Sequence, residues 1–91
     1  MILHVIEASV VGPTSLVVLF NDGVKRRVNV SPLLHGSVFE PLNDPIYFAT
    51  VTVDSKLGTV VWPNDADLAP EALYELPNEM DIQEQLHRQA G

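Results

Sequence analysis

Residues 15–30 read SLVVLFNDGVKRRVNV, and this stretch decides the fold class. Its first six residues are almost all apolar, which is typical of a central strand that is covered on both faces. The Asn-Asp-Gly sequence at 21–23 is a strong signal for a tight turn, because these residues accept the backbone angles that hairpin turns need. Residues 24–30 then alternate between apolar and polar, so the chain is predicted to return as an antiparallel partner strand.

The returning strand carries the densest basic cluster of the sequence, Lys25-Arg26-Arg27. Alternation places Lys25, Arg27 and Asn29 on a face that we expect to be wet. Arg26 falls on the apolar face, where its stem should pack while its head reaches water. We interpret the cluster as a solvated face and a charge-protected sheet edge rather than as a phosphate contact.

Further strand signals lie on both sides of this hairpin. A β-branched run at residues 2–6 is separated from it by a Gly-Pro turn at 11–14. Residues 46–53 and 59–62 are predicted to pair across a loop at 54–58. Because the strands follow one another as hairpins and do not alternate with long helices, we predict an α+β fold with about five strands in one small antiparallel sheet.

Short helices are expected between and after the strands. One helical turn is predicted at 31–34, and a second short irregular piece at 37–42. Residues 68–74 are predicted to form a helix, since Pro70 and Glu71 suit a helix start. Trp62, at the end of the last strand, is expected to cap the core beside this helix.

The chain is predicted to divide into a single α+β domain at 1–76 and a helical tail at 77–91. Asn78 is a candidate cap for the tail helix, whose apolar stripe is thin. A helix of about 13 residues is marginal by itself in water. The tail must therefore dock on its own sheet, on a second copy or on another molecule.

The composition excludes several classes of protein. Twelve acidic against five basic residues give a net charge of −7, which argues against nonspecific binding to nucleic acid or to an anionic membrane. The absence of cysteine excludes disulfide scaffolds, thiolate metal sites and cysteine nucleophiles. No basic leader and no apolar run of about 20 residues is present, so we expect a soluble cytoplasmic protein.

The polar residues form no recognisable catalytic motif. His4, His35 and His87 fall in separate predicted elements, and no nucleophile elbow or phosphate-binding glycine loop occurs. Residues 64–71 are rich in carboxylates, but they lack the glycine and glutamate of an EF-hand. We favour a capped, solvated loop there, with a hard-cation sensor as the alternative. We therefore expect no enzymatic activity, no cofactor and no bound metal.

Several motifs together resemble a known family. The most specific is W-P-N-x-x-D-L-x-P-x-x-L-Y at residues 62–74. The others are L-x-V-x-F-x-D-G at 16–23, V-x-V at 28–30 with P-L-L at 32–34, Phe48 with V-x-V-D at 51–54, and V-V-W-P-N at 60–64. Over about residues 1–74, the chain is similar to small bacterial proteins of the domain of unknown function 2442 family.

This resemblance implies a small α+β domain, built on an antiparallel sheet, for which no catalytic residues are assigned. Family members stand alone or precede a helix-turn-helix domain. Many are encoded beside a small toxin-like domain, which implies an antitoxin role. Ala69 departs from the pattern, since relatives often have a better helix-capping residue there. No DNA-binding domain follows the helix, so we expect no operator binding by this protein alone.

The function predicted from the sequence is a non-catalytic, protein-binding module, the antitoxin-like partner of a small basic toxin. Seven acidic residues and no lysine or arginine lie between residues 65 and 84. Electrostatic steering would favour a basic partner for this span. The alternative is a self-associating structural or regulatory module, in which the tail docks on a second copy and sheet edges pair. The predicted partner contacts are apolar Met80, Ile82 and Leu86, with Glu75, Glu79 and Glu84 as a charged rim.

Overall fold

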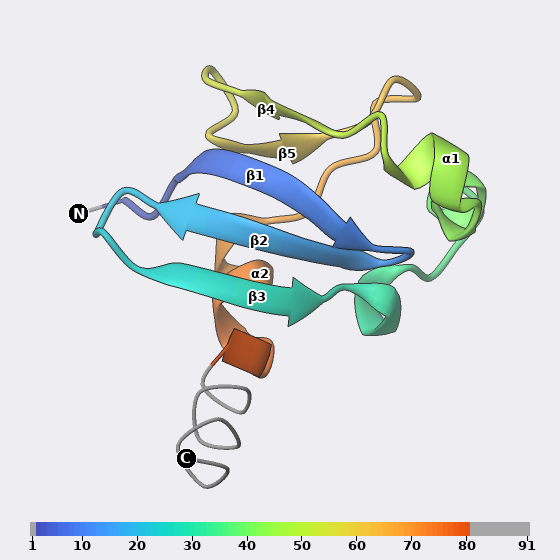
Figure 1. Cartoon of the computed structure of the whole chain (residues 1–91). Coiled ribbons are helices and arrows are strands. Elements are labelled where there is room, and N and C mark those ends of the chain that lie inside the picture. The colour runs from blue at the N-terminus through green and yellow to red at the C-terminus, as the bar shows by residue number, and fades with distance from the viewer. Residues whose placement is uncertain (1, 81–91) are drawn as a thin grey trace, which may run out of the picture.

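The computed structural model describes residues 2–80, which contain two small antiparallel sheets with short helices packed against them (Figure 1). The first sheet is a three-stranded meander in sequence order, and the second is a hairpin. The α+β class and the five strands are thus confirmed, although the strands divide between two sheets. They are β1 (Val5–Gly12), β2 (Ser15–Phe20), β3 (Lys25–Asn29), β4 (Thr52–Asp54) and β5 (Thr59–Val61).

Within residues 2–80, the helices are short and lie at one end and on the back of the meander. Figure 1 shows α2 behind the three strands and α1 beyond one end of them. No helix within residues 2–80 is long and apolar enough to cross a membrane. The helices are the 3-10 turns η1 (Ser31–Leu33) and η2 (Glu40–Asn43), followed by α1 (Pro45–Phe48) and α2 (Pro70–Glu75).

Strand β2 is central, as predicted, and one of its faces forms the middle of the core. Leu16, Val18 and Phe20 are completely buried, whereas Val17 and Leu19 on the opposite face are only partly buried. The prediction that both faces are covered is therefore half correct. The other fully buried hydrophobic residues come from β1, β3, η2, α1, β5 and α2 and from the position after β3: Val5, Val28, Val30, Leu42, Phe48, Val60 and Leu73.

The predicted strand at 46–53 is wrong over residues 46–51, because this segment begins as α1 and β4 starts only at Thr52. The side chain of Asp44 caps the helix by accepting from the Ile46 amide at 3.0 Å, and Pro45 occupies the first turn. Phe48 is fully buried at the end of this single turn. Local capping and burial thus outweigh the β propensity of the segment.

The first strand also differs from its prediction at 2–6, since β1 runs from residue 5 to 12. It pairs with β2 up to the tight turn at 13–14, with register irregularities at Val5/Glu7 and Val10/Gly12. These bulges keep the strand paired although its apolar pattern does not alternate cleanly. The Val5 amide also donates to the Gly58 carbonyl at 2.8 Å, which joins the meander to the β4–β5 hairpin.

The helix predicted at 68–74 is present as α2, shifted by one to two residues. Ala69 is its N-cap and contributes no side-chain hydrogen bond, as expected for alanine. Leu73 is its fully buried residue. Most of the predicted tail helix lies outside the described residues, of which Glu79 and Met80 are helical.

Candidate functional site

The chain leaves α2 along the free edge of β3, and two hydrogen bonds hold it there. The Arg26 guanidinium donates from Nη2 to the Leu76 carbonyl at 3.1 Å, and the Arg27 amide donates to Asn78 Oδ1 at 3.2 Å. The same Asn78 oxygen accepts from the Met80 amide at 3.1 Å. Asn78 therefore caps the next helical residues, as predicted, and fixes them to the sheet.

Tyr74 forms a second connection between α2 and the meander. Its ring lies edge-on to Phe20, with centroids 4.8 Å apart, and its hydroxyl donates to Asp22 Oδ2 at 2.9 Å. This hydrogen bond is the main reason that the pKa of Tyr74 is raised, with desolvation and the Asp22 charge adding to it. The carboxylate accepts a hydrogen bond from the phenolic O–H, which favours the neutral phenol over the phenolate.

The Arg26 guanidinium group was expected to reach water, but the structure places it against the Tyr74 ring. The residue is half-buried on the apolar face, as predicted, but its guanidinium carbon lies 5.0 Å from the centre of the Tyr74 ring. A cation over an aromatic face at this distance is attracted by the ring. Together with its hydrogen bond to Leu76, this contact makes Arg26 part of the attachment of the C-terminal segment. Nothing in the hydrophobic pattern of residues 24–30 indicated that role.

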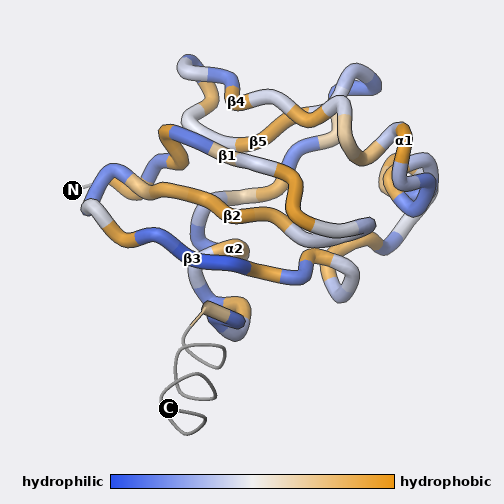
Figure 2. Tube along the Cα trace, in the orientation of Figure 1, coloured by the Kyte–Doolittle hydropathy of each residue, from blue (hydrophilic) through white to orange (hydrophobic). Residues whose placement is uncertain are grey.

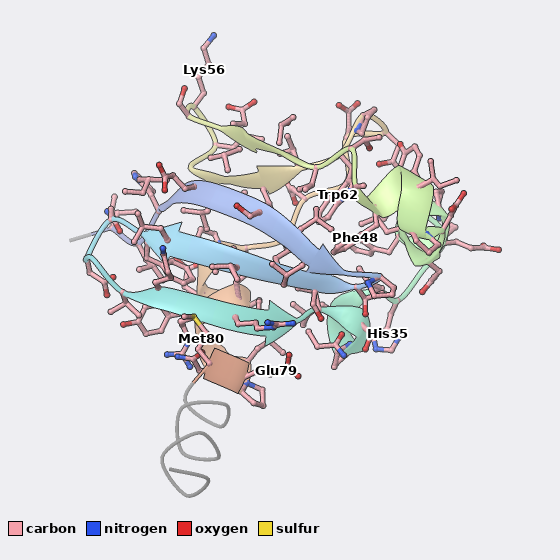
Figure 3. All side chains as sticks on the ribbon, viewed as in Figure 1. His35, Phe48, Lys56, Trp62, Glu79 and Met80 are labelled. Carbon is pink, nitrogen blue, oxygen red and sulfur yellow. The ribbon has the colours of Figure 1, made fainter. Side chains whose placement is uncertain are left out.

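Three of the six predicted partner residues lie in the described part of the chain, close to this attachment. Glu75 ends α2 and is exposed, Glu79 is half-buried, and Met80 is 36% exposed. Figure 3 shows Glu79 and Met80 beside β3, where the described chain ends. We call these three residues the 75–80 surface. Ile82, Glu84 and Leu86 lie outside the described residues.

The carboxylate-rich loop before α2 is organised by hydrogen bonds of the Asn64 side chain. Asn64 Oδ1 accepts from the Ala66 amide at 3.2 Å, and its Nδ2 donates to the Val38 carbonyl at 2.9 Å. Asp65 adopts a positive φ of 68° in the turn. Within residues 2–80, no group of three or more His, Asp or Glu side chains stands close enough to hold a metal ion.

A hollow of about 260 Å³ lies between the start of β1 and the β4–β5 hairpin. The His4 ring lies against Gly58, so closely that a Cβ added there would stand 2.7 Å from His4 Cδ2. His35 is exposed in a distant turn (Figure 3), and His87 is outside the described residues. His4 and Ser55 are the polar residues of the hollow, and Val5, Ile6, Val53 and Gly58 complete its lining.

A protein-family model described as "Protein of unknown function (DUF2442)" matches residues 5–79. The chain belongs to the DUF2442 family. The match spans all five strands and α2, so this part of the chain is a DUF2442 domain. Comparison with curated proteins and with solved structures finds no match. Asn78 and Glu79 lie inside the DUF2442 match, whereas Met80, Ile82, Glu84 and Leu86 lie beyond its end.

Proposed function

We propose that this DUF2442 protein is a non-catalytic, protein-binding module whose partner docks on the 75–80 surface beside β3. The observation that carries the proposal is the double role of Asn78, which accepts from the β3 backbone and from the Met80 amide. Because both bonds end on one side-chain oxygen, the first residues after α2 have a defined position on the domain. A partner therefore binds residues that are already ordered, so less conformational entropy is lost on binding.

The charge of this region supports a basic partner. Asp65, Asp67, Glu71, Glu75 and Glu79 follow one another with no lysine or arginine between them, and each is exposed or half-buried. Such a field of one sign accelerates encounter with a surface of the opposite sign. The partly exposed Met80 adds an adaptable apolar contact at its border.

The family resemblance supports a more specific partner, a small basic toxin-like protein. In this proposal the chain is the antitoxin-like member of the pair. Ile82, Glu84 and Leu86, which follow the 75–80 surface in the sequence, are proposed as further apolar and acidic contacts to this partner. The proposed interaction takes place in the cytoplasm and involves no direct contact with nucleic acid.

The experiment is a tagged purification from the native host, followed by calorimetric titration of the recovered partner with pure chain. We expect a small basic protein to co-elute in near-equal amount. The alternative function, self-association alone, predicts recovery of this chain by itself at dimer mass. Calorimetry with Glu79→Lys should show at least a tenfold weaker affinity, whereas Glu40→Lys makes the same charge change on η2 and should have little effect.

A truncated chain tests the contribution of the tail. The cut is best placed after Met80, because removal of Asn78 would also remove the hydrogen bond to β3. We expect chain 1–80 to fold and to bind the partner more weakly than the full chain. Unchanged binding by both chain 1–80 and Glu79→Lys would show that the partner docks elsewhere.

A further inference from the structure

The face of the meander that points away from α2 carries one row of residues with opposite charges at its two ends. Glu7 pairs with Leu19, and Leu19 pairs with Lys25, in the antiparallel registers of β1–β2 and β2–β3. Residues directly opposite in antiparallel strands point to the same face. The three therefore form one row with an acid on β1, a leucine on β2 and a base on β3. The neighbouring row consists of Ser9, Val17 and Arg27.

This face is accessible among the described residues. Glu7 and Lys25 are exposed, and Leu19 and Val17 are partly exposed, in contrast to the buried side of β2. In Figure 1 it is turned toward the viewer, with no described element in front of it. Figure 2 shows the apolar β2 bordered by the hydrophilic β3 on this sheet. Its centre is thus apolar and its two edges differ in charge.

We propose that this face binds the same face of a second copy of the chain, about a two-fold axis parallel to the strands. Such an axis reverses the order of the strands across the sheet and preserves position along them. It therefore places Glu7 of each protomer opposite Lys25 of the other, while the two Leu19 side chains meet near the axis. A two-fold axis perpendicular to the strands would instead put β1 over β1 and lose this pairing.

The size of the surface predicts a weak dimer. Three strands about 4.8 Å apart and five residues long, at about 3.4 Å per residue, span roughly 250 Å². A standard interface buries about 800 Å² on each partner. Because the surface is about a third of that size, we expect a weak dimer that is populated only at high protein concentration. Its two symmetric ion pairs should specify orientation more than affinity. The surface differs from the 75–80 surface and is independent of the proposed partner.

The test is sedimentation equilibrium of the full chain from about 10 to 500 µM in low salt, where ion pairs are least screened. We expect a monomer–dimer equilibrium. Glu7→Lys and Lys25→Glu should each weaken it about tenfold, since each variant sets like charges opposite one another. An equimolar mixture of the two variants should dimerise again, because both contacts of the heterodimer are then attractive. The double variant should also recover, and Glu40→Lys should behave as the unaltered chain.

Three results would overturn the proposal. The first is a chain that stays monomeric at 500 µM. The second is a dimer that neither charge reversal weakens, which would place the contact on the tail or on a strand edge. The third is a mixture of Glu7→Lys and Lys25→Glu that remains monomeric although both variants give the far-UV spectrum of the unaltered chain.

Discussion

Replacement of Trp62 by alanine should remove much of the stability of the domain. Only 2% of this residue is exposed, its ring lies 5.6 Å from that of Phe48, and its Nε1 donates to the Phe48 carbonyl at 2.9 Å (Figure 3). A buried tryptophan removes about 200 Å² from water, worth roughly 5 kcal/mol at about 25 cal/mol per Å². The lost hydrogen bond adds about 1 kcal/mol. Because the unfolded chain already buries part of the ring, we expect a net loss of about 3–5 kcal/mol.

The assay is urea unfolding followed by far-UV circular dichroism, since Trp62 is the single tryptophan and its fluorescence is lost in the variant. A domain of this size has a free energy of unfolding of about 5–10 kcal/mol. The urea concentration at the unfolding midpoint should therefore be much lower for Trp62→Ala than for the unaltered chain. Trp62→Phe keeps an aromatic ring but loses the N–H donor, and we expect a loss of about 1–3 kcal/mol. Ile46→Ala, at a residue that is 82% exposed, is the control and should change stability by less than about 0.5 kcal/mol.

This reasoning would be refuted if the free energy of unfolding of Trp62→Ala were within about 1 kcal/mol of that of the unaltered chain, because the loss of a buried indole ring destabilises a protein by more than this. Equal losses for the phenylalanine and alanine variants would refute the division between ring burial and hydrogen bond.

Three further substitutions test individual contacts. Asn78→Ala removes the acceptor shared by the β3 amide and the following helical turn, so it should cost about 1–2 kcal/mol in urea unfolding, and Asn78→Asp should retain most of it. Gly58 has a φ of 70°, and a Cβ added there would lie 2.7 Å from His4 Cδ2, so Gly58→Ala should lower the free energy of thermal unfolding by about 1–3 kcal/mol. Adding His4→Ala should restore only the part of this loss that comes from the steric clash. The hydrogen bond to Asp22 raises the pKa of Tyr74 in the folded state, so its contribution to stability is present below about pH 10 and is lost as pH rises through the folded pKa. Above about pH 10, the urea midpoint of Tyr74→Phe should therefore change less with pH than that of the unaltered chain. Urea unfolding at a series of alkaline pH values measures this difference.

Features of this fold that depend on neighbouring residues could be predicted from the sequence, whereas those that depend on distant contacts could not. The β2–β3 hairpin agrees closely with its prediction, because its apolar runs and the turn at 21–23 are local signals, and no long-range contact changes the pairing they favour. The segment 46–53 was misassigned because its residues favour strands individually, while Asp44 and Pro45 start a helical turn and Phe48 fills the core. The carbonyl of Phe48 then receives the Trp62 indole, a partner 14 residues away that no local pattern reveals.

The candidate site shows the same division. The acidic span and the capping role of Asn78 could be read from the sequence, since both depend on neighbouring residues. The second bond of Asn78, to Arg27, joins residues 51 positions apart, and the stacking of Arg26 on Tyr74 is similarly remote. These contacts depend on where α2 lies across the sheet, which local periodicity does not specify.

The sequence by itself determined the α+β class, the antiparallel hairpins, the acidic charge and the membership of the DUF2442 family. These properties follow from composition, local turn chemistry and a contiguous motif. Only the tertiary structure decided the division into two sheets, the attachment of the C-terminal segment to β3 and the charged row across the meander. Each of these depends on the register and packing of segments distant in the chain, and a one-residue change of register would turn every side chain of a strand to the other face.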